Sequence, residues 1–139
     1  MLGWFRLPRY ELLIESDRIT LADNRVRVEV EPRLSVAPNG RIIGVGIATS
    51  EQSGRVLELL GPVSPAERPQ FEERLAAFVA VFRHLIRAAQ RKTVFALRPH
   101  VRVYGASLLR PLFDGHEQQF LRDALVHAGA TRVEFAVSR

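Results

Sequence analysis

The chain has 139 residues, of which 47% are hydrophobic and 25% are charged, and its formal net charge is +5. This length and composition suit a single domain with a buried core. The absence of cysteine excludes disulfides and sulfur-based zinc sites, and it suits a cytoplasmic protein. No apolar run of about 18 residues is present, so the sequence predicts no membrane-spanning helix.

The first residues form an apolar and basic segment, residues 1–9, ahead of a single predicted domain, residues 10–139. Arg6 and Arg9 accompany its large apolar side chains, which are Leu2, Trp4, Phe5 and Leu7. Such a segment suits contact with lipid headgroups, and here this would be peripheral contact with an inner membrane. Packing against the core is the alternative, and the sequence leaves both open.

Residues 10–47 are rich in predicted strands. Apolar residues alternate with charged ones between turn signals at Asp17-Arg18 and Asp23-Asn24, which predicts a three-stranded antiparallel meander. Two further apolar runs, Leu34–Val36 and Ile42–Ile47, are expected to continue the same sheet. Residues 48–69 contain many glycines and prolines, so we expect a connecting excursion there in preference to a short helix near residues 50–60.

Residues 69–92 show the longest helical periodicity, with apolar residues three and four positions apart and Arg87, Arg91 and Lys92 near the end. The following segment around Phe95 and Leu97 suits either a short edge strand or a linker. Together with the meander, this helix predicts an α/β domain in which helices pack on a mixed five-stranded sheet.

Residues 101–137 predict a strand, a loop, a helix and a final strand. Asp114 and Glu117 have the spacing of N-cap and N3 residues, and Gly129 suits a left-handed C-cap. The two carboxylates and His116 also cluster where α/β sheets often place chemistry, but capping is the preferred interpretation. Gly105-Ala106-Ser107 is too weak a pattern to indicate a phosphate loop.

The four histidines, His84, His100, His116 and His127, lack the spacing of a helical metal site, and no residues complete a catalytic triad pattern. We therefore predict no metal, no cofactor and no enzymatic activity. The basic residues are spread along the chain without a recognition motif, so a solvated basic face is favoured over a nucleic-acid surface.

The order of these predicted elements resembles the first half of MreB, the rod-shape-determining family of bacterial actin homologues. Ile42–Gly46 is similar to the family's VLAVG strand and Pro32–Ala37 to its EPSVVAI segment. Glu117 and the stretch Ala128–Val133 match a helix start and an AGA turn into a strand. Met1–Arg6 is similar to the amphipathic N-terminus by which many members touch the membrane. The resemblance implies a ribonuclease-H-like, actin-type lobe.

The chain departs from that family at the first phosphate loop, which is Asp-x-Gly-Thr-like and lies between the first two strands. The equivalent turn here contains Glu15, Ser16 and Asp17 and has no glycine. It is thus a degenerate nucleotide site, because the glycine lets the backbone approach phosphate. We expect a non-enzymatic module for cell shape or cytoskeletal assembly that pairs with itself or with an actin-like filament protein. The alternatives are a basic nucleic-acid-binding module and an ATPase half-site completed by a partner.

Overall fold

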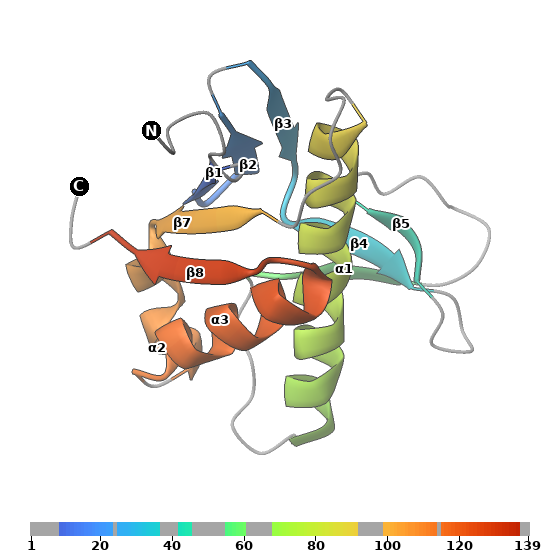
Figure 1. The fold of residues 1–139 in the computed structure, drawn as a ribbon. Coiled ribbons are helices and arrows are strands. Elements are labelled where there is room, and N and C mark those ends of the chain that lie inside the picture. The colour runs from blue at the N-terminus through green and yellow to red at the C-terminus, as the bar shows by residue number, and fades with distance from the viewer. Residues whose placement is uncertain are drawn as a thin grey trace, which may run out of the picture.

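The structure is a computed structural model, and it describes residues 9–23, 25–36, 42–45, 55–60, 68–91, 99–113 and 115–136. A five-stranded mixed sheet with strand order β3-β2-β1-β7-β8 forms its centre (Figure 1). The strands of this main sheet are β1 Arg9–Ile14, β2 Ile19–Ala22, β3 Arg27–Val30, β7 His100–Tyr104 and β8 Arg132–Phe135. β2 is antiparallel to β1 and β3, whereas β7 is parallel to both β1 and β8. The expected α/β class with a mixed five-stranded sheet is confirmed.

The first three strands form the antiparallel meander that the alternating pattern predicts. Leu12 pairs with Leu21, and Ile14 pairs with Ile19, so the apolar side chains of β1 and β2 share one face. In the second turn the Asp23 carboxylate accepts hydrogen bonds at 2.7 Å from the backbone amides of Arg25 and Val26. An Asx turn of this kind explains why aspartate marks this reversal.

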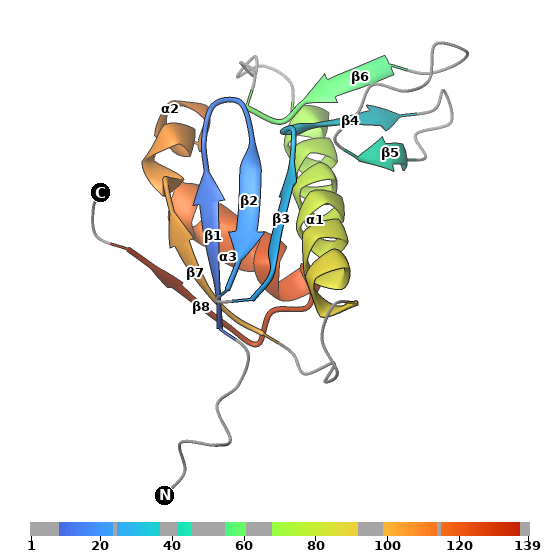
Figure 2. The ribbon, with the colours of Figure 1, turned by 90° about the horizontal axis from the view of Figure 1, so that it is seen from above.

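The strands after the meander do not continue the main sheet, contrary to the expectation. They form a separate three-stranded antiparallel sheet in the order β5-β4-β6 (Figure 2). Its strands are β4 Arg33–Val36, β5 Ile42–Val45 and β6 Arg55–Glu58. The chain bends at Pro32, where the Arg33 amide donates to the Glu31 carbonyl at 2.8 Å. Because proline has no N–H for a ladder, the bend takes β4 out of the main sheet.

The strand β6 also corrects the expectation for residues 48–69. The segment near residues 50–60 contains a strand, and not a helix, because β6 pairs with β4 along its whole length. The predicted connecting excursion therefore includes the third strand of the small sheet.

The longest helix, α1 Arg68–Gln90, confirms the predicted periodic segment. Buried Arg74 joins α1 to the small sheet, because one of its guanidinium nitrogens donates to the backbone carbonyls of Glu58 and Leu59. Arg87 lies in the last turn, where a cation is stabilised by the helix dipole. The segment around Phe95 and Leu97 lies outside the described residues.

The connection after β7 is more helical than predicted. A 3₁₀ helix, η2 Ala106–Leu109, and a short helix, α2 Arg110–Phe113, occupy the expected loop before helix α3 Glu117–Ala128. Gly129 ends α3 with a positive φ of 123°, which confirms the predicted C-cap. The predicted N-terminal cap is wrong for Glu117: it is the first helical residue, and His116 precedes the helix without a side-chain capping bond. Asp114 lies outside the described residues.

The core lies between one face of the main sheet and the helices α1 and α3 (Figure 2). Phe120 of α3 meets Phe78 of α1 edge-on at 5.3 Å between ring centroids and stacks on Phe113 of α2 at 4.0 Å. Each fully buried side chain of this size stabilises the fold by about 1.5–3 kcal/mol. The strand residues on this face are Tyr10, Leu12, Ile14, Ile19, Leu21, Val101 and Val103.

Gly105 ends β7 at a point of very close backbone approach to β1. Its φ is 83°, and a Cβ atom there would lie 2.2 Å from the carbonyl oxygen of Ile14. Only glycine fits, because a side chain would collide with backbone and the left-handed conformation is strained for other residues. The parallel pairing of β1 and β7 therefore depends on this residue.

We predict that Gly105→Ala lowers the free energy of unfolding by at least about 2 kcal/mol more than Gly115→Ala does. Gly115 is a matched control, because its φ is 87° but a Cβ atom there would have no atom within 4 Å from the other described residues, its chain neighbours apart. Urea unfolding followed by circular dichroism measures both values. Equal losses in the two variants would show that the contact with Ile14 does not constrain the fold.

We also predict that Tyr10 makes the fold sensitive to alkali. Burial, with a smaller contribution from Asp23, raises the pKa of Tyr10 above its ordinary value of 10.0. The unfolded chain therefore ionises first, and stability that is present below pH 10.0 is lost as the pH rises further. Tyr10→Phe should flatten this fall in the free energy of unfolding, whereas Tyr104→Phe should retain it; identical alkaline profiles for wild type and Tyr10→Phe would contradict the assignment.

Candidate functional site

The first candidate site is the edge of the main sheet where the parallel strands β1 and β7 end, since α/β proteins commonly bind ligands at this edge. The structure brings Glu15, Ser16 and Asp17 to this edge as the turn between β1 and β2. Gly105 lies beside them at the end of β7. The residues of the predicted degenerate nucleotide site thus lie at the edge of the sheet where α/β proteins commonly bind ligands.

The Glu15–Arg18 turn is a tight hairpin that closes on itself. The Glu15 amide donates to the Arg18 carbonyl at 2.9 Å, and the Arg18 Nε donates to the Glu15 carboxylate at 3.0 Å. The hydrogen bond that Arg18 donates to Glu15 raises the pKa of Arg18, with further contributions from the charges of Glu15, Glu29 and Asp17. The local field at this turn is therefore negative and unfavourable for phosphate.

Backbone packing fills the space beside this turn. The close contact between Gly105 and Ile14 brings main chain against main chain at the ends of β7 and β1. The following helix η2 has four residues, and the Leu108 amide donates a hydrogen bond to the Gly105 carbonyl at 3.1 Å. Gly105-Ala106-Ser107 therefore serves strand pairing and a helical turn.

Glu117 is a buried carboxylate that the sequence analysis did not identify as buried. Its side chain is 6% exposed, its Oε2 lies 3.5 Å from Arg110 Nε, and its Oε1 has no hydrogen-bond partner among the described residues. The signal was present in the helical spacing, because residue 117 falls on the same face as Phe120, Leu121 and Ala124. The carboxylate therefore belongs to the junction of α2 and α3.

The face of the main sheet opposite α1 and α3 carries mostly charged side chains that are paired across strands. Glu134 of β8 contacts both Arg9 at 3.1 Å and His100 at 2.8 Å. Tyr104 donates a hydrogen bond at 2.8 Å to the Glu11 carboxylate. The charges of Arg9 and Glu134 offset each other, and the Tyr104 hydroxyl satisfies the Glu11 carboxylate without neutralising it.

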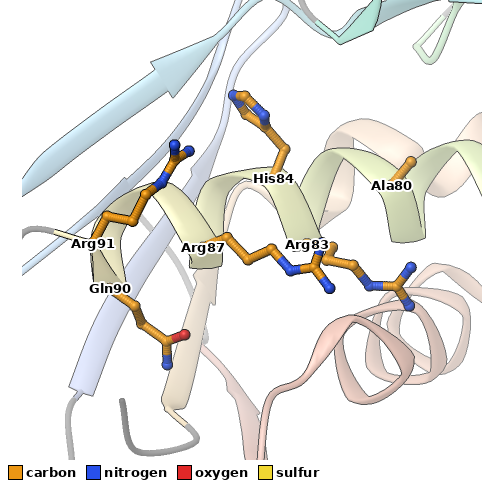
Figure 3. Close-up of a pocket in the computed structure, with 6 residues that line it drawn as sticks. All are labelled: Ala80, Arg83, His84, Arg87, Gln90 and Arg91. Carbon is orange, nitrogen blue, oxygen red and sulfur yellow. The ribbon is translucent and has the colours of Figure 1, made fainter. Parts of the chain in front are cut away.

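A basic stripe on α1 is the second candidate site (Figure 3). We define the basic stripe as Arg83, His84, Arg87 and Arg91, which with Ala80 and Gln90 line a hollow of about 690 Å³. Arg83 and Arg87 point to one side of the helix, whereas His84 and Arg91 point to the other. The described lining contains no carboxylate, so the hollow favours anions.

Only one member of the basic stripe is engaged within the described part of the chain. Arg83 donates to the carbonyl of His127 at 3.0 Å and so satisfies a carbonyl at the end of α3. Arg87 and Arg91 are exposed, and in the described residues their guanidinium groups have neither an ion pair nor a hydrogen bond. The sequence indicated cations near this helix end, but it did not show that these two stay unpaired.

The histidines and the membrane-related residues provide no further site among the residues that the structure describes. The four histidines lie on different elements or loops, and the described residues contain no group of three His, Asp or Glu side chains able to hold a metal. None of the described helices has both the length and the apolar character needed to cross a bilayer. Leu2, Trp4, Phe5 and Leu7 lie outside the described residues.

Comparison of the chain with protein-family models finds no match. Comparison with curated proteins finds none with significant similarity.

We predict that Arg83 and Arg87, one helical turn apart, differ in their structural roles. Arg83→Ala removes the bond to His127 and should lower the free energy of unfolding by about 1 kcal/mol. Arg87→Ala should change it by less than about 0.5 kcal/mol, because an exposed side chain without partners is removed. Urea unfolding of both variants measures the difference, and equal losses would show that Arg87 is also engaged in the folded chain.

Proposed function

We propose that the chain is a non-enzymatic interaction module with a ribonuclease-H-like, actin-type arrangement, related to cell shape or cytoskeletal assembly. The order of elements supports the proposal. An antiparallel meander is followed by the three strands of the small sheet, by a long helix and then by a strand, helical segments and a final strand, and these last two strands join the main sheet in parallel. This is the order that the resemblance to MreB implies.

The observation that carries the non-enzymatic part of the proposal is the closed Glu15–Arg18 turn. In nucleotide-binding members of the actin superfamily, a glycine-containing phosphate loop is expected at this point. Here a backbone bond and an ion pair close a short hairpin, and Gly105 packs against Ile14 beside it. These contacts support a lobe that binds partners without binding nucleotide.

The proposed partners are a second copy of the chain or an actin-like filament protein. The proposed location is the cytoplasm, with peripheral contact to the inner membrane through Leu2, Trp4, Phe5 and Leu7. The exposed guanidinium groups of Arg87 and Arg91, which have no ion pair within the described residues, support an interaction role, because exposed cations attract an oppositely charged surface.

A basic nucleic-acid-binding module is the second candidate, and the basic stripe is the observation that favours it. Phosphate groups would neutralise Arg87 and Arg91 and release counterions. This candidate differs from the leading proposal because it requires retention on DNA or RNA that weakens steeply as salt rises. No aromatic side chain lines the described hollow to stack on bases, which favours the protein partner.

We predict that the chain shows no saturable binding of Mg-ATP in the micromolar to millimolar range, measured by isothermal titration calorimetry. Glu15→Ala serves as the matched variant: it opens the Glu15–Arg18 ion pair and removes a carboxylate, so a weak hidden site would gain affinity. Saturable heat with wild-type protein, or hydrolysis of ATP by the chain alone, would overturn the non-enzymatic proposal. Hydrolysis only after a second protein is added would favour the half-site alternative.

A further inference from the structure

The face of the main sheet opposite α1 and α3 carries a hollow that follows β2. In Figure 2 this face is turned toward the viewer, because α3 lies behind the strands. The hollow has a volume of about 430 Å³, which is within the size range of small-molecule sites. It is separate from the Glu15–Arg18 turn and from the basic stripe. The residues that line it are Glu11, Leu13, Thr20, Ala22, Arg27 and Tyr104.

Short side chains on β2 form the floor of this hollow. The strand register places Ala22 between Glu11 of β1 and Arg27 of β3, and it places Thr20 beside Leu13 of β1. The backbones of β1 and β3 are about 10 Å apart, because β2 lies between them. The hollow therefore has a carboxylate on one side of a low floor and a guanidinium group on the other.

The carboxylate of Glu11 is held in place without being neutralised. It accepts a hydrogen bond at 2.8 Å from the Tyr104 hydroxyl. Arg102 is the neighbour of Glu11 on β7, but its guanidinium carbon lies over the Tyr104 ring, 5.8 Å from the centroid. Within the described residues Glu11 forms no ion pair. Its negative charge is therefore available to a cation in the hollow.

The guanidinium group of Arg27 is also largely available. The Arg27 side chain is 62% exposed, and its ion pair with Glu29 is long, at 3.5 Å. Exposed pairs of this kind contribute little to stability. An anionic group in the hollow can therefore compete for Arg27.

Thr20 is an independent indication that the floor contacts a ligand. The residue is 3% exposed, and its Oγ1 has no hydrogen-bond partner among the described residues. A buried hydroxyl without a partner costs free energy, which a hydrogen bond to a ligand on the floor would recover. Valine would fill the same space without this cost.

We propose that the hollow is a binding site for a small zwitterion of the α-amino acid class. The ammonium group contacts Glu11, and the ligand carboxylate accepts two hydrogen bonds from Arg27, which is the pairing that a guanidinium group favours. Leu13 and Ala22 provide an apolar surface for the ligand side chain. The inference goes beyond the proposed function and does not rest on it.

The two opposite charges select against simple ions. Glu11 repels a phosphate or another small anion, and Arg27 repels a simple cation. A zwitterion satisfies both groups at once, so each of its charges adds to affinity.

The test is titration of the ¹⁵N-labelled full chain with L-leucine, followed by NMR of the backbone amides. We expect saturable shifts at Thr20 and Ala22 in the millimolar range. Two further probes separate the charges, because isoamylamine lacks the carboxylate of leucine and 4-methylpentanoate lacks its amine. Each should bind at least about tenfold more weakly than L-leucine, because one charge-assisted hydrogen-bonded contact is lost.

Two variants assign each charge of the ligand to one wall. Glu11→Gln keeps an acceptor for Tyr104 but removes the charge, and Arg27→Gln removes the guanidinium group. Each should weaken L-leucine binding about tenfold. Isoamylamine should respond only to Glu11→Gln, and 4-methylpentanoate only to Arg27→Gln. Arg132→Gln is the matched control, because it removes a guanidinium group of β8 outside the hollow and should bind L-leucine as wild type does.

Thr20→Val separates ligand binding from folding. No hydrogen bond among the described residues is lost, so the urea midpoint of unfolding should not fall below that of wild type. L-leucine should nevertheless bind about fivefold more weakly, because the ligand loses one hydrogen bond. A lower midpoint with unchanged affinity would assign the hydroxyl to the fold and overturn its role in binding.

Three outcomes would overturn the inference as a whole. They are the absence of a saturable shift with L-leucine, equal affinity for the three probes, and L-leucine binding that neither Glu11→Gln nor Arg27→Gln weakens. Shifts at Thr20 and Ala22 that grow with protein concentration in the absence of a probe would assign the hollow to a second copy and would also overturn it. None of these outcomes involves nucleotide, so they are distinct from the Mg-ATP binding that would overturn the proposed function.

Discussion

The parallel pairing of β1 with β7 is the constraint on which the rest of the structure depends. It joins the N-terminal meander to the C-terminal half of the chain, which are separated by the small sheet and by α1. The pairing continues to the very end of β1 because Gly105 allows its backbone to contact the Ile14 carbonyl. Because β7 is parallel to β1, helix α1 returns the chain along the sheet before β7 begins. Helix α3 does the same between the parallel strands β7 and β8.

The same constraint separates the residues that stabilise the fold from those that remain available for contact with other molecules. The core between the sheet and the helices contains the large apolar side chains, including Phe78 and Phe120, whereas the ion pairs on the outer face are exposed. Exposed pairs contribute about 0–1 kcal/mol each. The charge pattern of the surface can therefore change without loss of the fold, and it is the part of the molecule that a partner can select.

Periodicity predicted the elements that have one buried face. The meander, α1, the strand at Val101 and the helix at Phe120 each show a regular apolar repeat that local spacing reveals. The small sheet was not predicted as a separate unit, because its existence depends on the bend at Pro32 and on pairing between distant segments. The short helices η2 and α2 carry no repeat long enough to be recognised.

The candidate site was predictable only in part, for the same reason. Glu15, Ser16 and Asp17 are neighbours in the sequence, so their common turn followed from the strands on either side. The engagement of Arg83 depends on its hydrogen bond to the carbonyl of His127, which is a tertiary contact with α3. The burial of Glu117 likewise depends on the packing of α2 against α3.

The bend at Pro32 also leaves β3 as an outer strand of the main sheet, with β8 as the other outer strand. Both carry alternating charges, Arg27 and Glu29 on β3 and Arg132 and Glu134 on β8. Charged outer strands oppose the addition of a further strand, which is how many proteins avoid aggregation through their sheet edges. Continuous β-sheets between molecules are therefore disfavoured. Side chains on the helices and turns are then the groups that can make specific contacts with other protein molecules.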